Sequence, residues 1–129
     1  MGKENKRRIC IDTDVSIALI KNLPPREHIM ELIIDRSICM SSVSAFELLL
    51  RKTNLDLVES FISKMEIIDF DFKSARIAST IAKTLVQNGI GLEGRDLFIA
   101  ATSISHECEL LTLNKKDFEN VPGISLVEF

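Results

Sequence analysis

The sequence predicts an α/β protein with a three-layer α/β/α architecture and a mainly parallel central sheet of four to five strands. Short apolar segments of strand length recur along the chain, and segments with helical periodicity separate them. Strands that alternate with helices form parallel sheets covered on both faces, and right-handed crossovers restrict their topology. No internal repeat or linker divides the chain. We therefore expect one α/β/α domain.

Length and composition agree with a single globular unit. The chain has 129 residues, of which 46% are hydrophobic and 27% charged, enough for a substantial core. We expect a basic tail at residues 1–8 and one domain at residues 9–129. The net charge of −3 argues against binding nucleic acid through overall positive charge, so local basic residues and metal would have to hold it.

The cysteines indicate a reducing, cytoplasmic setting. Cys10, Cys39 and Cys108 are far apart in the sequence and form no CxxC pair, and an odd number argues against a disulfide framework. Cys10 and Cys39 lie in apolar segments and are expected to be buried. Asp12 interrupts the first apolar segment, which disfavours a signal peptide, and no segment approaches the ~18 apolar residues of a membrane span.

The first strand ends in two acids. Residues 9–14 read Ile-Cys-Ile-Asp-Thr-Asp, so the strand presents Asp12 at its carboxyl end, and Asp14 is expected to cap the following helix. Ligands of open α/β sheets bind just outside the carboxyl ends of the strands. Asp12 is therefore either a structural cap or the first member of a metal site.

The elements of the first half follow from periodicity and from turn residues. Pro25 suits a first helical position, and Ser44 with Glu47 forms a capping box that opens a helix. Phe46, Leu49 and Leu50 are expected on the apolar side of that helix. The expected elements are helices at 14–21 and 26–35, a strand at 37–41, a helix opening at Ser44, and a helix at 57–65.

In the second half, Asp71 is expected to cap a long helix. The expected elements are strands at 66–70 and 109–113, helices at 72–88 and 97–108, a polar loop at 114–121, and an edge strand at 124–129. The helix at 97–108 is apolar almost all round its first half, so it is expected to be central. The buried stripe of the helix at 72–88 is expected at Ala75, Ala78, Ile81, Ala82 and Leu85.

Acidic or amide side chains recur where these strands end. Asp12 ends the first strand, and Glu47 and Asp96 lie near the starts of two helices. Asn114 and Asp117 follow the fourth strand. Each alone is explained by helix capping, but all are expected at one edge of the sheet, where carboxylates repel one another unless a cation is bound. Oxygen ligands point to Mg²⁺ or Mn²⁺, which activates water and neutralises charge on a phosphodiester.

Four segments carry a resemblance to a known family. Residues 9–14, 44–48, 95–102 and 111–118 resemble the PIN-domain family and are most similar to the VapC-type toxins of type II toxin–antitoxin systems. The last two segments, Arg-Asp-Leu-Phe-Ile-Ala-Ala-Thr and Leu-Thr-Leu-Asn-Lys-Lys-Asp-Phe, are the most specific. The resemblance covers essentially the whole chain.

The resemblance implies a Mg²⁺- or Mn²⁺-dependent endoribonuclease. In such an enzyme Asp12 and Asp96 would be the central metal ligands, with Glu47 beside them. The fourth position falls at Asn114 or Asp117, of which Asp117 is favoured because a carboxylate can bind the ion directly. The resemblance also places Asp14 and Thr112 next to the metal ligands. Many relatives carry Asn at the position of Asp14, and Thr112 is expected to hydrogen-bond among the acids.

Family membership would also imply a homodimer and a protein antitoxin that covers the acidic groove. The helices at 26–35 and 44–65 carry more apolar residues than one core face needs, so they are candidates for these interfaces. The side chains proposed to hold RNA phosphates, together with the basic tail, are Arg51, Lys52, Lys115 and Lys116.

Three alternatives remain open at this point. One is a PIN-domain nuclease of RNA processing, and another is a module that binds RNA or a partner without cutting. The third is a haloacid-dehalogenase-type phosphatase, whose first strand also ends in Asp-x-Asp, as Asp12 and Asp14 do here. The lysine and the later acidic pair of that class are not at suitable places.

Overall fold

The computed structural model describes residues 6–128. Residues 1–5 of the expected basic tail and Phe129 of the expected last strand lie outside the described residues. A parallel sheet with the strand order β3-β2-β1-β4 forms the centre. Its strands are β1 (Ile9–Ile11), β2 (Ile38–Ser41), β3 (Glu66–Ile68) and β4 (Glu109–Leu111).

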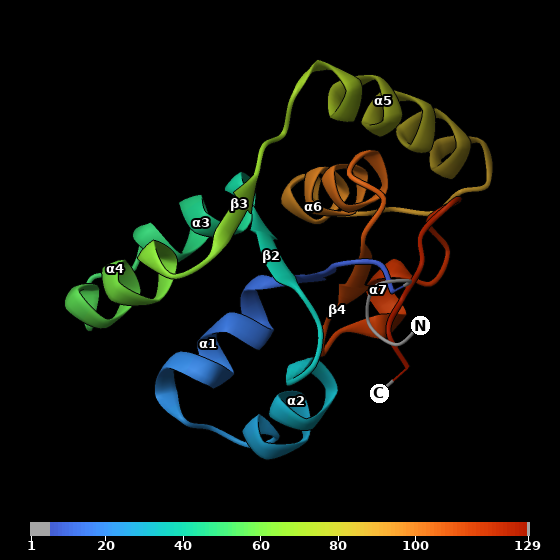
Figure 1. Cartoon of the computed structure of the whole chain (residues 1–129). Coiled ribbons are helices and arrows are strands. Elements are labelled where there is room, and N and C mark those ends of the chain that lie inside the picture. Colours follow the sequence, from blue (N-terminus) through green and yellow to red (C-terminus); the bar gives the residue numbers. More distant parts are fainter. Residues whose placement is uncertain (1–5, 129) are drawn as a thin grey trace.

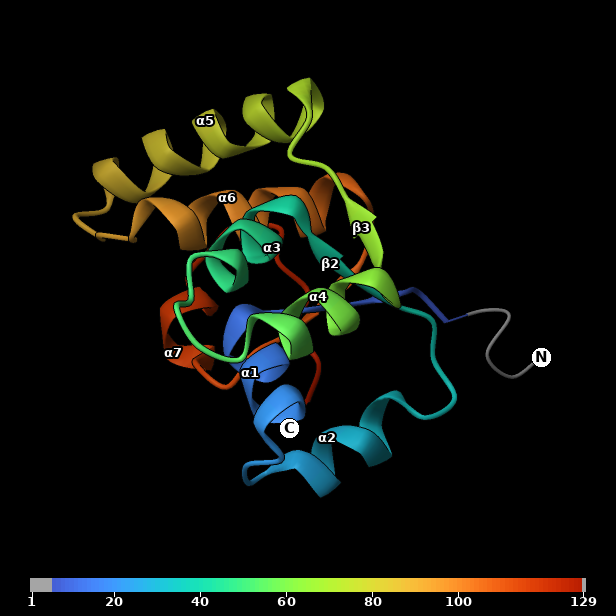
Figure 2. The same ribbon diagram turned by 90° about the vertical axis from the view of Figure 1, so that its left-hand side faces the viewer.

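Helices cover both faces of this sheet, as Figures 1 and 2 show. On one side lie α1 (Thr13–Lys21), α2 (Arg26–Ile33), α3 (Ser42–Leu49) and α4 (Leu55–Ser63). On the other side α6 (Gly94–Ser105) lies next to the sheet, and α5 (Phe72–Gln87) packs on α6. A short helix, α7 (Lys115–Phe118), follows β4. The predicted three-layer α/β/α architecture is confirmed.

Alternating side chains of the short strands build two cores. Ile9 and Ile11 point to the side of α1–α4, whereas Cys10 packs with residues of α5 and α6. All three cysteines are buried and free. The prediction that α6 is central is confirmed, because residues 99–103 are all buried.

Two expected helix caps are wrong. The N-cap of α1 is Asp12, and Asp14 lies inside the first turn, because the helix follows the strand without an intervening loop. Likewise β2 runs directly into α3, so Ser41 is the N-cap and its hydroxyl accepts the Ser44 N–H. Glu47 therefore lies in the second turn of α3, where its carboxylate is free of any capping role.

The side of α3 that was expected to be its apolar side does not face the core. Phe46, Leu49 and Leu50 are 52%, 46% and 53% exposed, and Leu48 is the buried side chain instead. The core covers only a narrow face of α3, so the apolar side chains beside Leu48 stay exposed.

Further along the chain, the Asp71 cap of α5 is confirmed, and its carboxylate accepts the Ser74 N–H. The buried stripe of α5 differs in part from the prediction, because Ser74 is buried while Ala75 and Ala82 are only half-buried.

Three smaller expectations also change. Pro25 is the N-cap of α2 and not its first residue. The loop expected at 114–121 contains α7. The expected edge strand at 124–129 is reduced, within the described residues, to a parallel bridge between Leu126 and Leu110.

Residues 6–8, the part of the expected basic tail that the structure describes, contact the rest of the domain. Arg8 donates to Glu66 over 2.8 Å, and Lys6 lies 3.6 Å from Asp35. Between residues 6 and 128 the chain forms no helix that is long and apolar enough to cross a membrane.

Candidate active site

The predicted acids lie around one edge of the sheet. Asp12 follows β1, Glu47 lies on α3 after β2, and Asp117 lies on α7 after β4. Asp96 is in the first turn of α6. Because parallel strands end at the same edge, segments far apart in the sequence bring these carboxylates near one another. We call Asp12, Glu47, Asp96 and Asp117 the acidic site.

Asp12 is the most buried of the four. Its side chain is 5% exposed, and its carboxylate accepts hydrogen bonds from the Thr13 N–H at 2.8 Å and from the Thr112 hydroxyl at 2.7 Å. Burial and, after it, the charge of Asp14 raise the pKa of Asp12 to about 7, against the lowering effect of the two hydrogen bonds. The expected hydrogen bond of Thr112 is thereby confirmed.

Asp96 lies across from Asp12 at the start of α6. Burial and the neighbouring charges of Glu93, Asp117 and Glu47 together raise the pKa of Asp96 to about 6. Glu93 is the N-cap of α6 and accepts the Asp96 N–H at 3.2 Å. Glu93 was not among the predicted residues, because glutamate is not one of the side chains that typically cap a helix N-terminus.

Glu47 is held from two sides. Its Oε1 accepts the Thr13 hydroxyl at 2.6 Å, and its Oε2 lies 3.4 Å from the Arg95 guanidinium. Arg95 also lies over the ring of Phe46 at 5.6 Å from its centre. Thr13 and Arg95 were missed in the sequence, where the only signal is that each directly adjoins an acid of the site.

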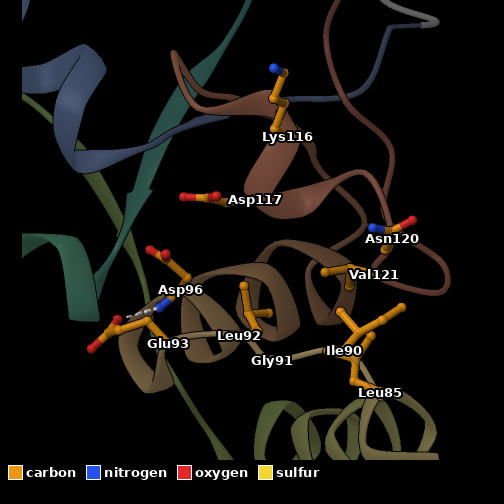
Figure 3. Close-up of a pocket in the computed structure, with 10 residues that line it drawn as sticks. All are labelled: Leu85, Ile90, Gly91, Leu92, Glu93, Asp96, Lys116, Asp117, Asn120 and Val121. Atoms are coloured by element: carbon orange, nitrogen blue, oxygen red, sulfur yellow. Dashed lines mark hydrogen bonds between the residues drawn. The ribbon is translucent and has the colours of Figure 1, made fainter. Parts of the chain in front are cut away.

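The two candidates for the fourth position, Asp117 and Asn114, lie in different surroundings. Figure 3 shows the carboxylates of Asp117 and Asp96 at the same end of a cleft, and the charge of Asp117 acts on Asp96. Asn114 is the N-cap of α7, and its backbone N–H donates to the Thr112 hydroxyl at 3.0 Å. Asn114 therefore contacts Thr112, and the Thr112 hydroxyl in turn donates a hydrogen bond to the Asp12 carboxylate.

Asp14 connects two strand ends. Its carboxylate accepts the Leu113 N–H at 3.2 Å, which ties α1 to the segment after β4. Burial raises the pKa of Asp14 as well. Its negative charge opposes the ionisation of Asp12.

The basic residues proposed for RNA binding are dispersed. Lys116 lines the cleft of Figure 3, whereas Lys115 lies 3.7 Å from Glu128. Arg51 and Lys52 follow the end of α3 and do not line that cleft. Their roles in binding RNA stay predictions.

The donor set is compatible with a hard divalent cation. In the part of the chain that the structure describes, no three side chains of Asp, Glu, His or Cys converge into a ready-made metal site. Mg²⁺ and Mn²⁺ keep several waters and are commonly held by one or two carboxylates, so an open site of this kind is sufficient. The raised pKa values of Asp12 and Asp96 reflect burial and repulsion that a bound cation would offset.

Replacing Thr112 with valine is expected to destabilise the protein by about 1–3 kcal/mol at pH 8. The substitution removes a buried donor to Asp12 and the acceptor of the Asn114 N–H. Urea unfolding measures the effect. Thr80→Val is the matched control, because that exposed hydroxyl bonds only within its own helix, to the Arg76 carbonyl. Equal stability of the two variants would show that Thr112 does not support Asp12.

Comparison with known proteins identifies the family of this chain. The family profile of the PIN domain matches residues 9–124. A relative from Salmonella typhimurium, named "tRNA(fMet)-specific endonuclease VapC", is 32% identical, and the alignment covers 95% of this chain and 98% of the relative. A relative of the same name from Shigella flexneri is 27% identical over 91% of this chain and 94% of its own length.

Solved structures show the same fold. A DNA-bound VapBC complex from Salmonella typhimurium contains a chain with a TM-score of 0.79 and 28% identity, covering 95% of this chain and 97% of that one. For VapBC2 from Rickettsia felis, bound to a promoter DNA fragment, the TM-score is 0.80 at 24% identity, with 95% and 98% covered. The fold, the acidic edge and the sequence match lead to one conclusion: this chain belongs to the PIN-domain family.

Proposed function

We propose that this chain is a divalent-metal-dependent endoribonuclease that hydrolyses RNA phosphodiester bonds, and that it is the toxin of a type II toxin–antitoxin pair. The observation that carries the proposal is the placement of the four carboxylates of the acidic site around the carboxyl edge of a PIN-domain sheet, where the charges of neighbouring acids act on Asp12 and Asp96. The names of the VapC relatives, which are endonucleases and ribonucleases, support the same activity.

In this proposal each residue has a distinct task. Asp12 and Asp96 hold the cation, which is Mg²⁺ or Mn²⁺, with Glu47 and Asp117 beside them. When bound, such an ion neutralises charge on the phosphodiester and lowers the pKa of an attacking water. Thr112 and Thr13 fix the Asp12 carboxylate through their hydrogen bonds, and Thr13 also orients Glu47. Asp14 fastens the segment after β4 to this edge, and the Asn114 N–H donates to the Thr112 hydroxyl within that segment.

The proposed substrate is a transfer RNA. Two relatives that align with at least nine-tenths of this chain are named as specific for tRNA(fMet), which supports initiator tRNA as the substrate to test first. A PIN-domain nuclease of RNA processing would use the same site on other RNAs, so the substrate separates these two possibilities.

The proposed partners are a second copy of the chain and a protein antitoxin. Related chains were solved as toxin–antitoxin complexes. Exposed apolar side chains on α3 and α4, including Phe46, Leu49, Leu50 and Leu57, give this chain a surface suited to protein contacts. The setting proposed for this activity is cytoplasmic, where the free cysteines stay reduced.

Two of the earlier alternatives lose support. Membership of the PIN-domain family over residues 9–124 is incompatible with a haloacid-dehalogenase-type phosphatase. A module that binds without cutting has no need for several carboxylates that raise one another's pKa.

Purified protein is expected to cleave tRNA(fMet) with Mn²⁺ or Mg²⁺, and EDTA is expected to stop the reaction. Asp96→Asn is expected to slow cleavage at least about 100-fold, because it removes a charge from the cation site. Gel analysis of end-labelled RNA measures the rates. Asp71→Asn is the matched control, since asparagine also caps a helix and Asp71 caps α5 away from the acidic site. Cleavage that survives EDTA or Asp96→Asn would contradict the proposal, and RNA binding without cutting would favour the binding module.

A further inference from the structure

Arg95 brings a positive charge into the acidic site. Its guanidinium lies 3.4 Å from the Oε2 atom of Glu47, and it directly precedes Asp96 in the first turn of α6. The other ion pairs between residues 6 and 128 all involve acids outside the acidic site. In this part of the chain, Arg95 is therefore the basic residue that is paired with a proposed metal ligand.

The two oxygens of Glu47 are held with different strength. Oε1 accepts the Thr13 hydroxyl at 2.6 Å, which is a short hydrogen bond to a side chain at the start of α1. Oε2 has the longer contact with Arg95, whose side chain is 46% exposed. Ion pairs that are this exposed contribute little to stability. Arg95 can therefore leave Glu47 at small cost, while Thr13 keeps the carboxylate in place.

Phe46 keeps the guanidinium close to the site. The guanidinium carbon of Arg95 lies 5.6 Å from the centre of the Phe46 ring, and half of Phe46 is exposed. An aromatic ring attracts a cation over its face without using the N–H groups of that cation. Arginine has five N–H donors, so those that do not face Glu47 remain available to an anion from the solvent.

The charge of the acidic site indicates which anion this is. When its four carboxylates are ionised, one divalent cation offsets only half of their charge, so an RNA phosphate is still repelled. A second positive group is needed beside the cation. Arginine suits this task because its planar guanidinium binds a phosphate through two parallel hydrogen bonds, which lysine cannot form.

We propose that Arg95 binds a phosphate of the RNA strand at the acidic site, and that it is released from Glu47 for this task when that carboxylate binds the divalent cation. The inference rests on the proposed function, because Glu47 is a proposed ligand of the cation. In the free protein Arg95 and Glu47 offset each other's charge. Once Glu47 turns to the cation, the guanidinium is free for a phosphate, so cation and RNA favour each other's binding.

The experiment compares the unsubstituted protein with Arg95→Gln, Arg95→Lys and Arg76→Gln. Arg76 is the matched control, because its guanidinium also lies over a phenylalanine ring, 4.7 Å from the centre of Phe72, but on the outer helix α5 (Figure 2). Cleavage of tRNA(fMet) with Mn²⁺ at several salt concentrations gives kcat and KM. Isothermal titration calorimetry without RNA gives the affinity for Mn²⁺.

Arg95→Gln is expected to raise KM about tenfold, the scale of one hydrogen-bonded contact between charged groups. It is expected to lower the slope of log KM against log salt by about 0.7–0.9, because one phosphate contact is lost. Without RNA it is expected to bind Mn²⁺ about threefold more tightly, because nothing competes for Glu47. Arg95→Lys is expected to keep the salt slope but not the full affinity for RNA, and Arg76→Gln to change none of these quantities.

The outcomes separate this inference from the proposed function. If Arg95→Gln cuts RNA with the KM and salt slope of the parent, Arg95 only neutralises Glu47, and the inference is wrong while the nuclease stands. If the affinity for Mn²⁺ does not rise, Arg95 and the cation do not compete for Glu47, and the inference is also overturned. If the unsubstituted protein cuts no RNA, the proposed function fails. Fluorescence anisotropy with labelled RNA and Mn²⁺ then tests Arg95 separately, and equal affinities of Arg95→Gln and Arg76→Gln would overturn the inference as well.

Discussion

Asp12→Asn is expected to abolish RNA cleavage, by at least about 1,000-fold, and at the same time to stabilise the metal-free protein at pH 8 by about 2 kcal/mol. The two effects have one cause. Asp12 is 5% exposed and has Asp14 and Asp96 beside it, so its negative charge is costly without a cation. Asparagine removes that charge and with it the central ligand proposed for the metal.

The hydrogen bonds of Asp12 allow this substitution. The asparagine oxygen can keep the bond from the Thr13 N–H, and its amide can donate to the Thr112 hydroxyl in place of the bond that Thr112 now donates. Urea unfolding in EDTA at pH 8 gives the stability, and cleavage of labelled RNA gives the activity. Asp71→Asn, a capping position on α5, should show neither the gain nor the loss. If the variant is inactive but no more stable than the parent at pH 8, the charge of Asp12 does not destabilise the metal-free protein.

The metal-free protein is expected to lose stability as the pH rises from about 4 to about 7. The pKa of Asp12 is about 7 in the folded protein and 3.8 in its ordinary state, so in this window the folded state keeps a proton that the unfolded chain has released. The folded state then binds more protons, and stability falls as the pH rises. For Asp12 the full loss is about 4 kcal/mol and is complete above pH 7. The raised pKa of Asp96 acts in the same direction.

Mn²⁺ is expected to reverse this loss. Below pH 5 the cation must displace a proton from Asp12, whereas at pH 8 it meets a carboxylate that is already charged, so the rise in melting temperature should be larger at pH 8. Thermal unfolding with EDTA or Mn²⁺ from pH 4 to pH 8 measures both effects. The difference between the parent protein and Asp12→Asn isolates the part due to Asp12, because other carboxylates such as Asp71, whose pKa is lowered, act in the opposite sense. An equal Mn²⁺ effect at both pH values would contradict the assignment of the metal to Asp12.

Local patterns predicted the path of the chain well. The apolar segments around Ile11 and Met40 indicated buried strands, and Asp71 indicated the start of α5. Errors occurred where a strand passes directly into a helix. Asp12 and Ser41 each end a strand and cap a helix at once, so a search for a separate cap selected Asp14 and Ser44.

The face of α3 shows a different limit. Phe46, Leu49 and Leu50 have a helical spacing that is typical of a buried side, yet they are exposed. Hydrophobic periodicity identifies an apolar face but does not say whether the core of the same chain covers it. Here the core takes up Leu48, and the other three apolar side chains stay exposed.

The sequence alone determined that acids follow the strands of a parallel sheet and therefore meet at one edge, because strand direction and the right-handed crossover leave little choice. Only the tertiary structure decided how these acids behave. The pKa of Asp12 is raised because the fold buries its carboxylate and places the charges of Asp14 and Asp96 near it, while the hydrogen bond from Thr112, 100 positions away, lowers that pKa. Glu47 is fixed by Thr13, 34 positions away. The cleft beside Asp96 and Asp117 is formed between α5, α6 and α7. Burial, charge repulsion and cavity shape depend on neighbours in space, which the order of residues does not state.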